Sequence, residues 1–141
     1  MIKTSKETDY EIVSNYSKQD GNIEKDNKVT SVITIEDIID KVRNYIEKNY
    51  DKDITLNDLA EKFAVSVAYL SKAFRIQTGV SFSRYLINKR IEQAKKLLVG
   101  TDIPISDISK SIGYDDIQYF YRIFKREVKC TPVNFRRRVR N

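Results

Sequence analysis

The chain has 141 residues and a formal charge of +6, with one cysteine and no histidine. Without histidine, the common zinc sites and the His-dependent catalytic triads are excluded, so we expect no catalytic residue, no metal, no cofactor and no enzyme activity. No apolar run approaches the roughly 18 residues that span a bilayer, the first residues lack the apolar core of a secretion signal, and Cys130 cannot form an internal disulfide, so we expect a cytoplasmic protein without membrane contact.

Residues 1–33 are dominated by polar and charged side chains, and their few apolar residues keep no sustained period. This composition predicts a disordered lead or linker. The β-branched run at residues 29–35 is compatible with a short strand, but no second strand pattern exists for it to pair with. No sheet is therefore predicted.

Helical periodicity begins at Thr34, a suitable N-cap residue, and is carried by Ile35, Ile38, Ile39, Val42, Ile46 and Tyr50. After a polar break at residues 49–53, Thr55 is placed to cap a helix of about two turns. Its predicted inner face is Leu56, Leu59, Ala60 and Phe63.

Ser66 and Gly79 mark the beginning and the end of a third helix. Its spacing predicts an inner face of Leu70, Ala73 and Phe74, and an outer face of Val67, Ala68, Ser71, Lys72 and Arg75. A long helix follows between Ser81 and Gly100. It carries a wide apolar stripe formed by Phe82, Tyr85, Leu86, Ile91, Ala94, Leu97 and Leu98.

Pro104 is placed at the start of another two-turn helix with Ile105, Ile108 and Ile112 inward. Asp115 or Asp116 caps the helix after that. We expect this helix to bury Phe120, Ile123 or Phe124, and Val128, and to turn outward Ile117, Gln118, Tyr121, Arg122 and Lys125. Thr131 and Pro132 open a last basic helix with Phe135, Arg136, Arg137, Arg138 and Arg140.

The second half of this pattern repeats the first. Asp58 matches Asp107, and after one inserted residue Tyr69-Leu70 matches Tyr119-Phe120. Each copy is a short helix, a tight turn with Ala64 or Gly113, and a longer helix with a basic outer face. This is the pattern of a helix-turn-helix, so we expect an internal duplication.

The charge of the chain is unevenly distributed. Residues 1–53 carry 9 Lys/Arg and 12 Asp/Glu (−3), whereas residues 54–141 carry 17 and 8 (+9). A basic helix-turn-helix suits a major groove about 12 Å wide. The helix between the copies spans roughly 27 Å, comparable with the ~34 Å between successive major-groove faces, so one monomer could read two consecutive grooves and bend the DNA.

The segments SVAYLSKAFRIQTGVSFSRYLINKRIEQAKKLL, ISDISKSIGYDDIQYFYRIFK and TPVNFRRR resemble the DNA-binding region of AraC/XylS-type transcription regulators over about residues 35–140. The resemblance implies an all-α fold with about seven helices, arranged as two homeodomain-like helix-turn-helix subdomains joined by a long central helix. The domain boundaries expected from it are 34–141 for the whole region, with 34–80, 81–99 and 100–141 as first unit, connecting helix and second unit.

Four positions depart from the family pattern: Gln118, Ser109, Ala73 and Lys129 stand where the family usually has Ser, Ala, Leu and Gly. Lys129 has the largest consequence, because it must leave its helix without the conformational freedom of glycine. We expect the corner before Thr131 to be built differently or to be less stable.

The resemblance also implies functional residues. The predicted base-reading residues are Ala68, Ser71 and Lys72 on the first reading helix, and Ile117, Gln118, Tyr121 and Arg122 on the second. Gln118 and Arg122 are favoured because Gln pairs bidentately with adenine and Arg with guanine. The predicted phosphate contacts are Ser66, Arg75, Lys125 and Thr131.

Other side chains have simpler interpretations. The helical spacing of Tyr69, Phe74, Tyr119, Phe120 and Phe124 predicts core residues and not a base-stacking surface. Lys89 and Arg90 are interpreted as a solvated face or a brace between the two halves. The arginines from 136 to 140 are a solvated tail or face DNA, and Cys130 is an incidental small residue.

The expected partner is double-stranded DNA, with RNA polymerase as a candidate second partner. The DNA-binding part is expected to act as a monomer, with any dimerisation through a separate domain. Both a stand-alone regulator and the C-terminal piece of a longer chain fit the sequence. The alternative function is a helical protein-interaction module, such as an anti-activator or an adaptor that docks on RNA polymerase, without specific DNA readout.

Overall fold

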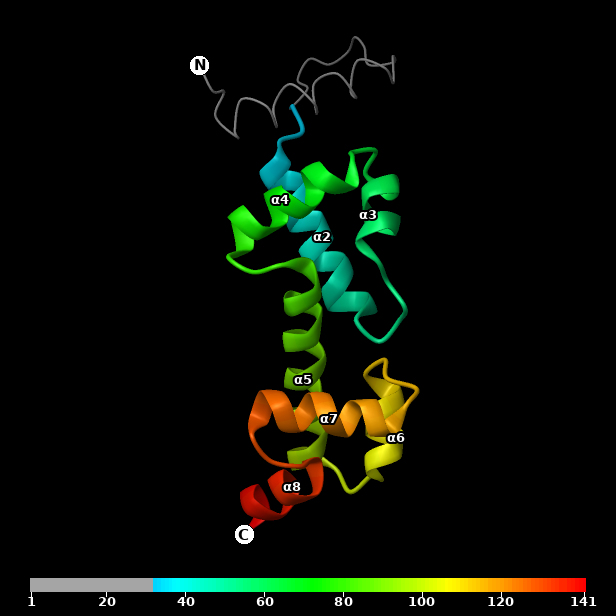
Figure 1. Cartoon of the computed structure of the whole chain (residues 1–141), viewed down its shortest axis with the longest axis vertical. Coiled ribbons are helices and arrows are strands. Elements are labelled where there is room, and N and C mark those ends of the chain that lie inside the picture. The colour runs from blue at the N-terminus through cyan, green and yellow to red at the C-terminus, as the bar shows by residue number, and fades with distance from the viewer. Residues whose placement is uncertain (1–31) are drawn as a thin grey trace. The chain divides into compact units, whose positions relative to one another are not determined.

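The computed structural model describes residues 32–141, which contain seven α-helices and no strand (Figure 1). The prediction of an all-α chain with about seven helices is confirmed. The predicted polar lead at 1–33 falls almost entirely outside the described residues. The helices are α2 (Ile35–Asn49), α3 (Leu56–Lys62), α4 (Val67–Thr78), α5 (Phe82–Gly100), α6 (Ile105–Ser111), α7 (Ile117–Val128) and α8 (Pro132–Arg140).

These residues form two compact units. Unit 1 contains the described residues up to Tyr45 together with Ile54–Phe82, and unit 2 contains Ile46–Asp53 and Ser83–Asn141. Unit 2 therefore includes a short stretch that precedes the first helix-turn-helix in the chain.

The predicted internal duplication is confirmed by the helix bounds. Helices α3 and α6 have the same length, and so do α4 and α7. Counted in residues between helix starts, α7 follows α4 by one residue more than α6 follows α3. The inserted residue therefore lies in the turn between α6 and α7. The starts of α5 and α8, at Phe82 and Pro132, are separated by the same interval as the starts of α4 and α7.

Most of the predicted helix caps are present. The side chains of Thr55, Ser66 and Thr131 each accept a hydrogen bond, at 3.1 Å, from the backbone amide three residues later. Thr34 and Asp37 form a reciprocal pair of such bonds at the start of α2. These caps satisfy amides that the helix itself leaves without an acceptor.

The predicted starts of two helices, α5 and α6, differ slightly from the structure. Helix α6 begins one residue later than predicted, so Pro104 is its N-cap, and the proline side chain has no acceptor for a capping hydrogen bond. Similarly, α5 begins at Phe82, after Ser81, and Gly100 is its last residue. The predicted choice between Asp115 and Asp116 is resolved, since Asp116 accepts from the amides of α7.

Four residues adopt positive φ at equivalent points of the two copies. In the helix-helix turns these are Ala64 at +57° and Gly113 at +106°, and at the ends of α4 and α7 they are Gly79 at +87° and Lys129 at +73°. The expectation that the corner after α7 is built differently is wrong. The Lys129 amide donates to the Lys125 carbonyl at 2.9 Å, as the amide of Gly79 donates to that of Arg75 at 2.8 Å. Lys129 thus adopts a conformation that glycine occupies at lower energy.

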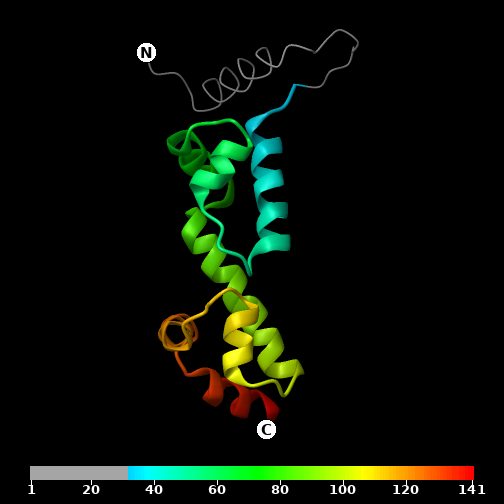
Figure 2. The same cartoon turned by 90° about the vertical axis from the view of Figure 1, so that its right-hand side faces the viewer.

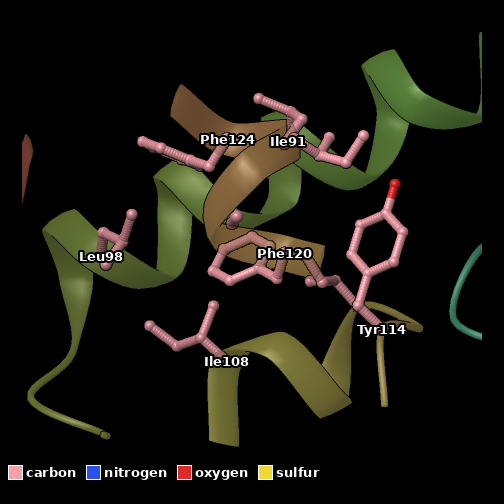
Figure 3. Packing of buried hydrophobic residues seen from close by; sticks show 9 residues of the cluster. Ile91, Leu98, Ile108, Tyr114, Phe120 and Phe124 are labelled. Atoms are coloured by element: carbon pink, nitrogen blue, oxygen red, sulfur yellow. The ribbon is translucent and has the colours of Figure 1, made fainter. Parts of the chain in front are cut away.

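The core of unit 2 forms where α7 crosses α6 and the C-terminal part of α5. Figure 2 views α7 end-on, while α6 and α5 run along the page beside it. In Figure 3, Phe120 of α7 lies at the centre of the apolar cluster, between Ile108 of α6 and the labelled side chains of α5. Phe124 packs edge-on against Phe120, with 5.7 Å between the ring centroids. This core fixes which face of α7 remains available to solvent.

Unit 1 has its own core, formed by α2, α3 and α4. Its fully buried side chains include Ile39, Val42, Leu59, Leu70 and Phe74. Phe74 meets Phe82 edge-on, with 6.0 Å between the ring centroids. The inner face predicted for α4, Leu70, Ala73 and Phe74, is confirmed.

Candidate nucleic-acid interface

The outer face of α4 is open to solvent. Its predicted base-reading residues, Ala68, Ser71 and Lys72, are all exposed, as is Arg75 one turn further on. The side chain of Lys72 makes no hydrogen bond or ion pair with another residue of 32–141. Helix α4 therefore presents a mostly small and neutral surface with two cationic side chains.

The outer face of α7 carries longer polar side chains. Gln118, Arg122 and Lys125 are exposed and occupy successive turns of the helix. Asp116 holds the start of this helix by accepting from the amides of Gln118 at 2.9 Å and Tyr119 at 3.3 Å. The side-chain donors of Gln118 and Arg122 form no hydrogen bond with other described side chains, so they remain available to a ligand.

The other two predicted base-reading residues of α7 are only partly accessible. Ile117 and Tyr121 are half-buried. Tyr121 packs against the core cluster of unit 2 and meets Phe120 edge-on, with 6.4 Å between the centroids. Each of these two side chains is therefore less accessible to solvent than the exposed side chain of Gln118.

The prediction that Tyr119 is a core residue is wrong. Its side chain is 40% exposed, whereas Phe74, Phe120 and Phe124 are fully buried as predicted. Tyr69, the equivalent residue in the first copy, is half-buried. Tyr119 shares the outer arc of α7 with Arg122, and the Arg122 guanidinium lies 5.5 Å from the centroid of the Tyr119 ring. Tyr119 lies three residues before Arg122, and residues at this spacing share one face of a helix. The predicted outward position of Arg122 could therefore have indicated that Tyr119 is exposed.

The four predicted phosphate contacts differ in their surroundings. Ser66 is exposed and Thr131 is half-buried, and each uses its oxygen to accept from a helix amide. Their hydroxyl hydrogens can still be donated to an anion. Arg75 and Lys125 are exposed near the ends of α4 and α7, and neither forms an ion pair with another residue that the structure describes.

The arginines of α8 do not act as a single surface. Arg136 donates to the carbonyls of Leu98 and Thr101, at 3.2 and 3.1 Å, and thereby satisfies the C-terminal end of α5. Arg140 pairs with Asp102 and also donates to the Thr101 carbonyl. These two residues hold α8 against the end of α5, so they do not belong to a free tail; whether the arginines of α8 face DNA stays a prediction.

Of the two interpretations of Arg90, a solvated face is wrong, and its side chain acts as a brace inside unit 2. Its side chain is 9% exposed and donates to the carbonyls of Tyr50 at 2.6 Å and Lys52 at 2.8 Å. Its guanidinium also lies 4.9 Å from the ring centroid of Tyr114. Arg90 is therefore not a solvated residue; within unit 2 it connects the stretch after α2 to the turn between α6 and α7.

Lys89, next to Arg90, is also largely removed from solvent. Its side chain is 11% exposed and pairs with Glu47, with Glu92 at 3.9 Å as a second partner. The interpretation of Lys89 as a solvated cation is therefore wrong. Both of its carboxylate partners belong to unit 2.

The described residues give no indication of other kinds of site. Within 32–141 no three His, Cys, Asp or Glu side chains come together in a group that could hold a metal ion. None of the helices in this part of the chain combines the length and the apolar character needed to cross a membrane.

Comparison with known proteins agrees with this geometry. A family model described as a helix-turn-helix domain matches residues 59–138. The uncharacterised HTH-type transcriptional regulator YdiP of Escherichia coli is 34% identical over 126 residues, which are 89% of this chain and 38% of YdiP. The chain thus spans little more than a third of the length of that relative.

Solved structures show the same fold. The C-terminal domain of AraT, a response regulator from Geobacillus stearothermophilus, is 38% identical with a TM-score of 0.69, covering 71% of this chain and 84% of that chain. The DNA-binding domain of AdpA, crystallised with a target DNA, is 22% identical, also with a TM-score of 0.69, covering 72% of this chain and 92% of its own. The resemblance seen in the sequence is confirmed, and the chain belongs to the AraC-type helix-turn-helix family of transcription regulators.

Proposed function

We propose that the chain is a sequence-specific regulator of transcription that places α4 and α7 in two successive major grooves of double-stranded DNA. The observation that carries this proposal is the equivalence of the two helices. Each begins with a side-chain cap, buries an aromatic face and exposes its other face, and the two occupy matching places in the duplication. In this proposal the chain acts by binding DNA, not by catalysis, in the cytoplasm.

Helix α7 supplies the more specific readout. Gln118 and Arg122 are exposed one turn apart, and their side-chain donors are not used by other described residues. An amide side chain can pair bidentately with adenine, and a guanidinium with guanine. Each such pair discriminates against a wrong base by about 1–3 kcal/mol. We assign these two residues as the principal base readers.

Helix α4 supplies a weaker readout. Ala68 and Ser71 are exposed but short, and Lys72 is a flexible point charge. Such a surface can touch a thymine methyl or hold a bridging water, and it can follow the shape of the groove. The first groove therefore contributes more to position than to discrimination.

Phosphate contacts at both ends of α4, and at the C-terminal end of α7 and the start of α8, would hold the reading helices in register. Ser66 and Thr131 lie at helix starts, where backbone amides favour an anion, and Arg75 and Lys125 supply positive charge. These contacts make binding dependent on salt, because each neutralised phosphate releases a condensed counterion.

A pair of substitutions on one helix tests the assignment. Arg122→Ala should relax the preference at one base pair by about 1–3 kcal/mol. Lys125→Ala, three residues away, should weaken binding to every duplex alike and reduce the slope of log K against log salt by about 1. Both are measured by fluorescence anisotropy against a selected duplex and its single-base variants. Equal, uniform losses in the two variants would contradict the assignment.

The rival function is a protein-interaction module, with RNA polymerase as the candidate partner. It draws support from the exposed Val67, at 41%, and from Ala68, which give the outer face of α4 an apolar part. A salt titration with random duplex DNA separates the two functions. Steep loss of affinity with salt supports DNA binding, and no binding at low salt would eliminate it. Sedimentation of the DNA complex would show whether the chain binds as a monomer, as we propose.

A further inference from the structure

Tyr119 lies directly beside the principal base-reading arginine. The Arg122 guanidinium is within the distance at which a cation is attracted to an aromatic face, at 5.5 Å from the ring centroid. The two side chains also line one open hollow of the surface, together with Ile123, Lys125 and Arg126. Tyr119 is the most exposed aromatic residue of α7, so packing in the core does not account for an aromatic side chain at this position.

The ring of Tyr119 is itself held from the inner side. Tyr114 meets it edge-on, with 5.5 Å between centroids and 67° between the ring planes. Tyr114 is only 6% exposed, and it stacks on Phe120 at 6.1 Å. Burial raises the pKa of the Tyr114 hydroxyl, while the nearby Arg90 opposes that shift. Tyr119 therefore rests on a ring that the core of unit 2 fixes in place.

Tyr119 and Tyr114 belong to a row of side chains in contact with one another, and Arg90 lies at its buried end. Its guanidinium lies 4.9 Å from the Tyr114 centroid, and it donates two hydrogen bonds to backbone carbonyls that restrain it. The order from inside to outside is thus Arg90, Tyr114, Tyr119, Arg122. Each contact in the row is between a cation and a ring or between two rings, and all four residues belong to unit 2.

We propose that Tyr119 is a positioning residue that orders the Arg122 side chain for base recognition before DNA binds. This inference rests on the proposed function. A free arginine side chain loses about 2 kcal/mol of rotamer entropy when it is fixed at a base. Attraction to a ring reduces that loss in advance, which is the general basis of preorganisation.

The contact with Tyr119 does not compete with base readout. A guanidinium has five N–H donors in its own plane, and attraction to a ring face uses its charge and none of those donors. Arg122 has no ion pair with the described carboxylates, whereas its neighbour Arg126 pairs with Glu127 at 2.9 Å. Arg122 is therefore both oriented and free to donate to guanine, while Arg126 is held by a competing acceptor.

The test uses the full chain with three variants: Tyr119→Leu, Tyr119→Phe and Arg122→Ala. The base pair read by Arg122 is first identified as the one whose preference disappears in Arg122→Ala. Affinities are then measured for the selected duplex, for that duplex changed at this one pair, and for random DNA. An exposed cation–π contact corresponds to a change of about two- to fivefold.

We expect Tyr119→Leu to reduce the preference at that base pair about two- to fivefold, with unchanged affinity for random DNA and an unchanged salt slope. Tyr119→Phe keeps the ring and should match the wild type. In the Arg122→Ala background, Tyr119→Leu should have no effect on base preference. In the DNA-free protein, the Arg122 Hε resonance should be shifted upfield by the ring and should lose that shift in Tyr119→Leu alone.

Three results would overturn the inference while the proposed function stands: a wild-type preference in Tyr119→Leu, an effect of Tyr119→Leu that persists in Arg122→Ala, or a loss on all duplexes in Tyr119→Phe. The last would show that the Tyr119 hydroxyl contacts a phosphate. If the wild-type chain has no base preference at all, the proposed function fails and the inference fails with it. A circular dichroism melt of each variant excludes unfolding as the cause.

Discussion

Replacing Gly113 with alanine tests how closely the turn between α6 and α7 is built around Arg90. Gly113 has a φ of +106°, well outside the narrow left-handed region near +57° that alanine tolerates. A Cβ atom added at this position would lie 2.8 Å from both Cζ and Nη2 of Arg90. The substitution therefore has two costs, one in the backbone and one in the side chain it displaces.

The two costs can be estimated separately. A strained backbone conformation costs about 1–3 kcal/mol. Displacing the guanidinium also weakens its hydrogen bonds to the Tyr50 and Lys52 carbonyls, and a hydrogen bond to a charged group contributes about 1.5–3 kcal/mol. We therefore expect Gly113→Ala to lower the free energy of unfolding by about 2.5–6 kcal/mol in all.

The assay is equilibrium urea unfolding, followed by far-UV circular dichroism, in the wild-type chain and in an Arg90→Leu background. Leucine ends before the position of the guanidinium, so in that background only the backbone cost of about 1–3 kcal/mol should remain. Ala64→Gly is the matched control in the first copy, where φ is +57°, and it should change stability by less than about 1 kcal/mol. An equal cost of Gly113→Ala in both backgrounds would refute the role given to Arg90.

Three further predictions concern single side chains. Lys129→Gly should raise the free energy of unfolding by about 0.5–1 kcal/mol, because glycine adopts a φ of +73° without strain; a lower melting temperature in circular dichroism would contradict this. Asp116→Ala should cost about 1 kcal/mol in urea unfolding, since it removes the acceptor for two amides of α7, and an unchanged midpoint would count against the cap. The hydrogen bond from Arg84, at 2.7 Å, is the main cause that lowers the pKa of Glu127 from its ordinary value of 4.5. Because its folded-state pKa is the lower one, Glu127 stabilises the fold above pH 4.5 and this contribution is lost as the pH falls through the folded-state pKa. Glu127→Gln should therefore be less stable than the wild type at neutral pH and equal to it in acid; a gap in melting temperature that persists in acid would contradict the pairing.

Local signals predicted the helices well. The hydroxyl and carboxylate residues at Thr55, Ser66 and Asp116 cap their helices because each acceptor lies within three residues of its donor. The duplication was equally visible, since matched side chains recur at a nearly constant separation, with one residue inserted in the turn of the second copy. Such features depend on the order of residues along the chain alone, so no knowledge of the tertiary fold was required.

The residues that the sequence misjudged all depend on distant neighbours. Tyr119, Phe120 and Tyr121 are three consecutive aromatics that together face most of the way round a helix, and only the position of the core decides which one is buried. Arg90 finds its acceptors 40 and 38 residues away in the chain. Spacing along one helix cannot reveal either arrangement.

The hydrogen bonds of Arg90 also limit how this chain can be divided. A fragment that begins at Ser83 contains the whole of the second helix-turn-helix but lacks Tyr50 and Lys52, the residues whose carbonyls Arg90 needs. Its guanidinium would lose both of these acceptors, and a hydrogen bond to a charged group contributes about 1.5–3 kcal/mol. The two repeats are thus similar in sequence and form but are not interchangeable cassettes: the second can be transplanted only together with Ile46–Asp53, which lies on the far side of the first repeat in the chain.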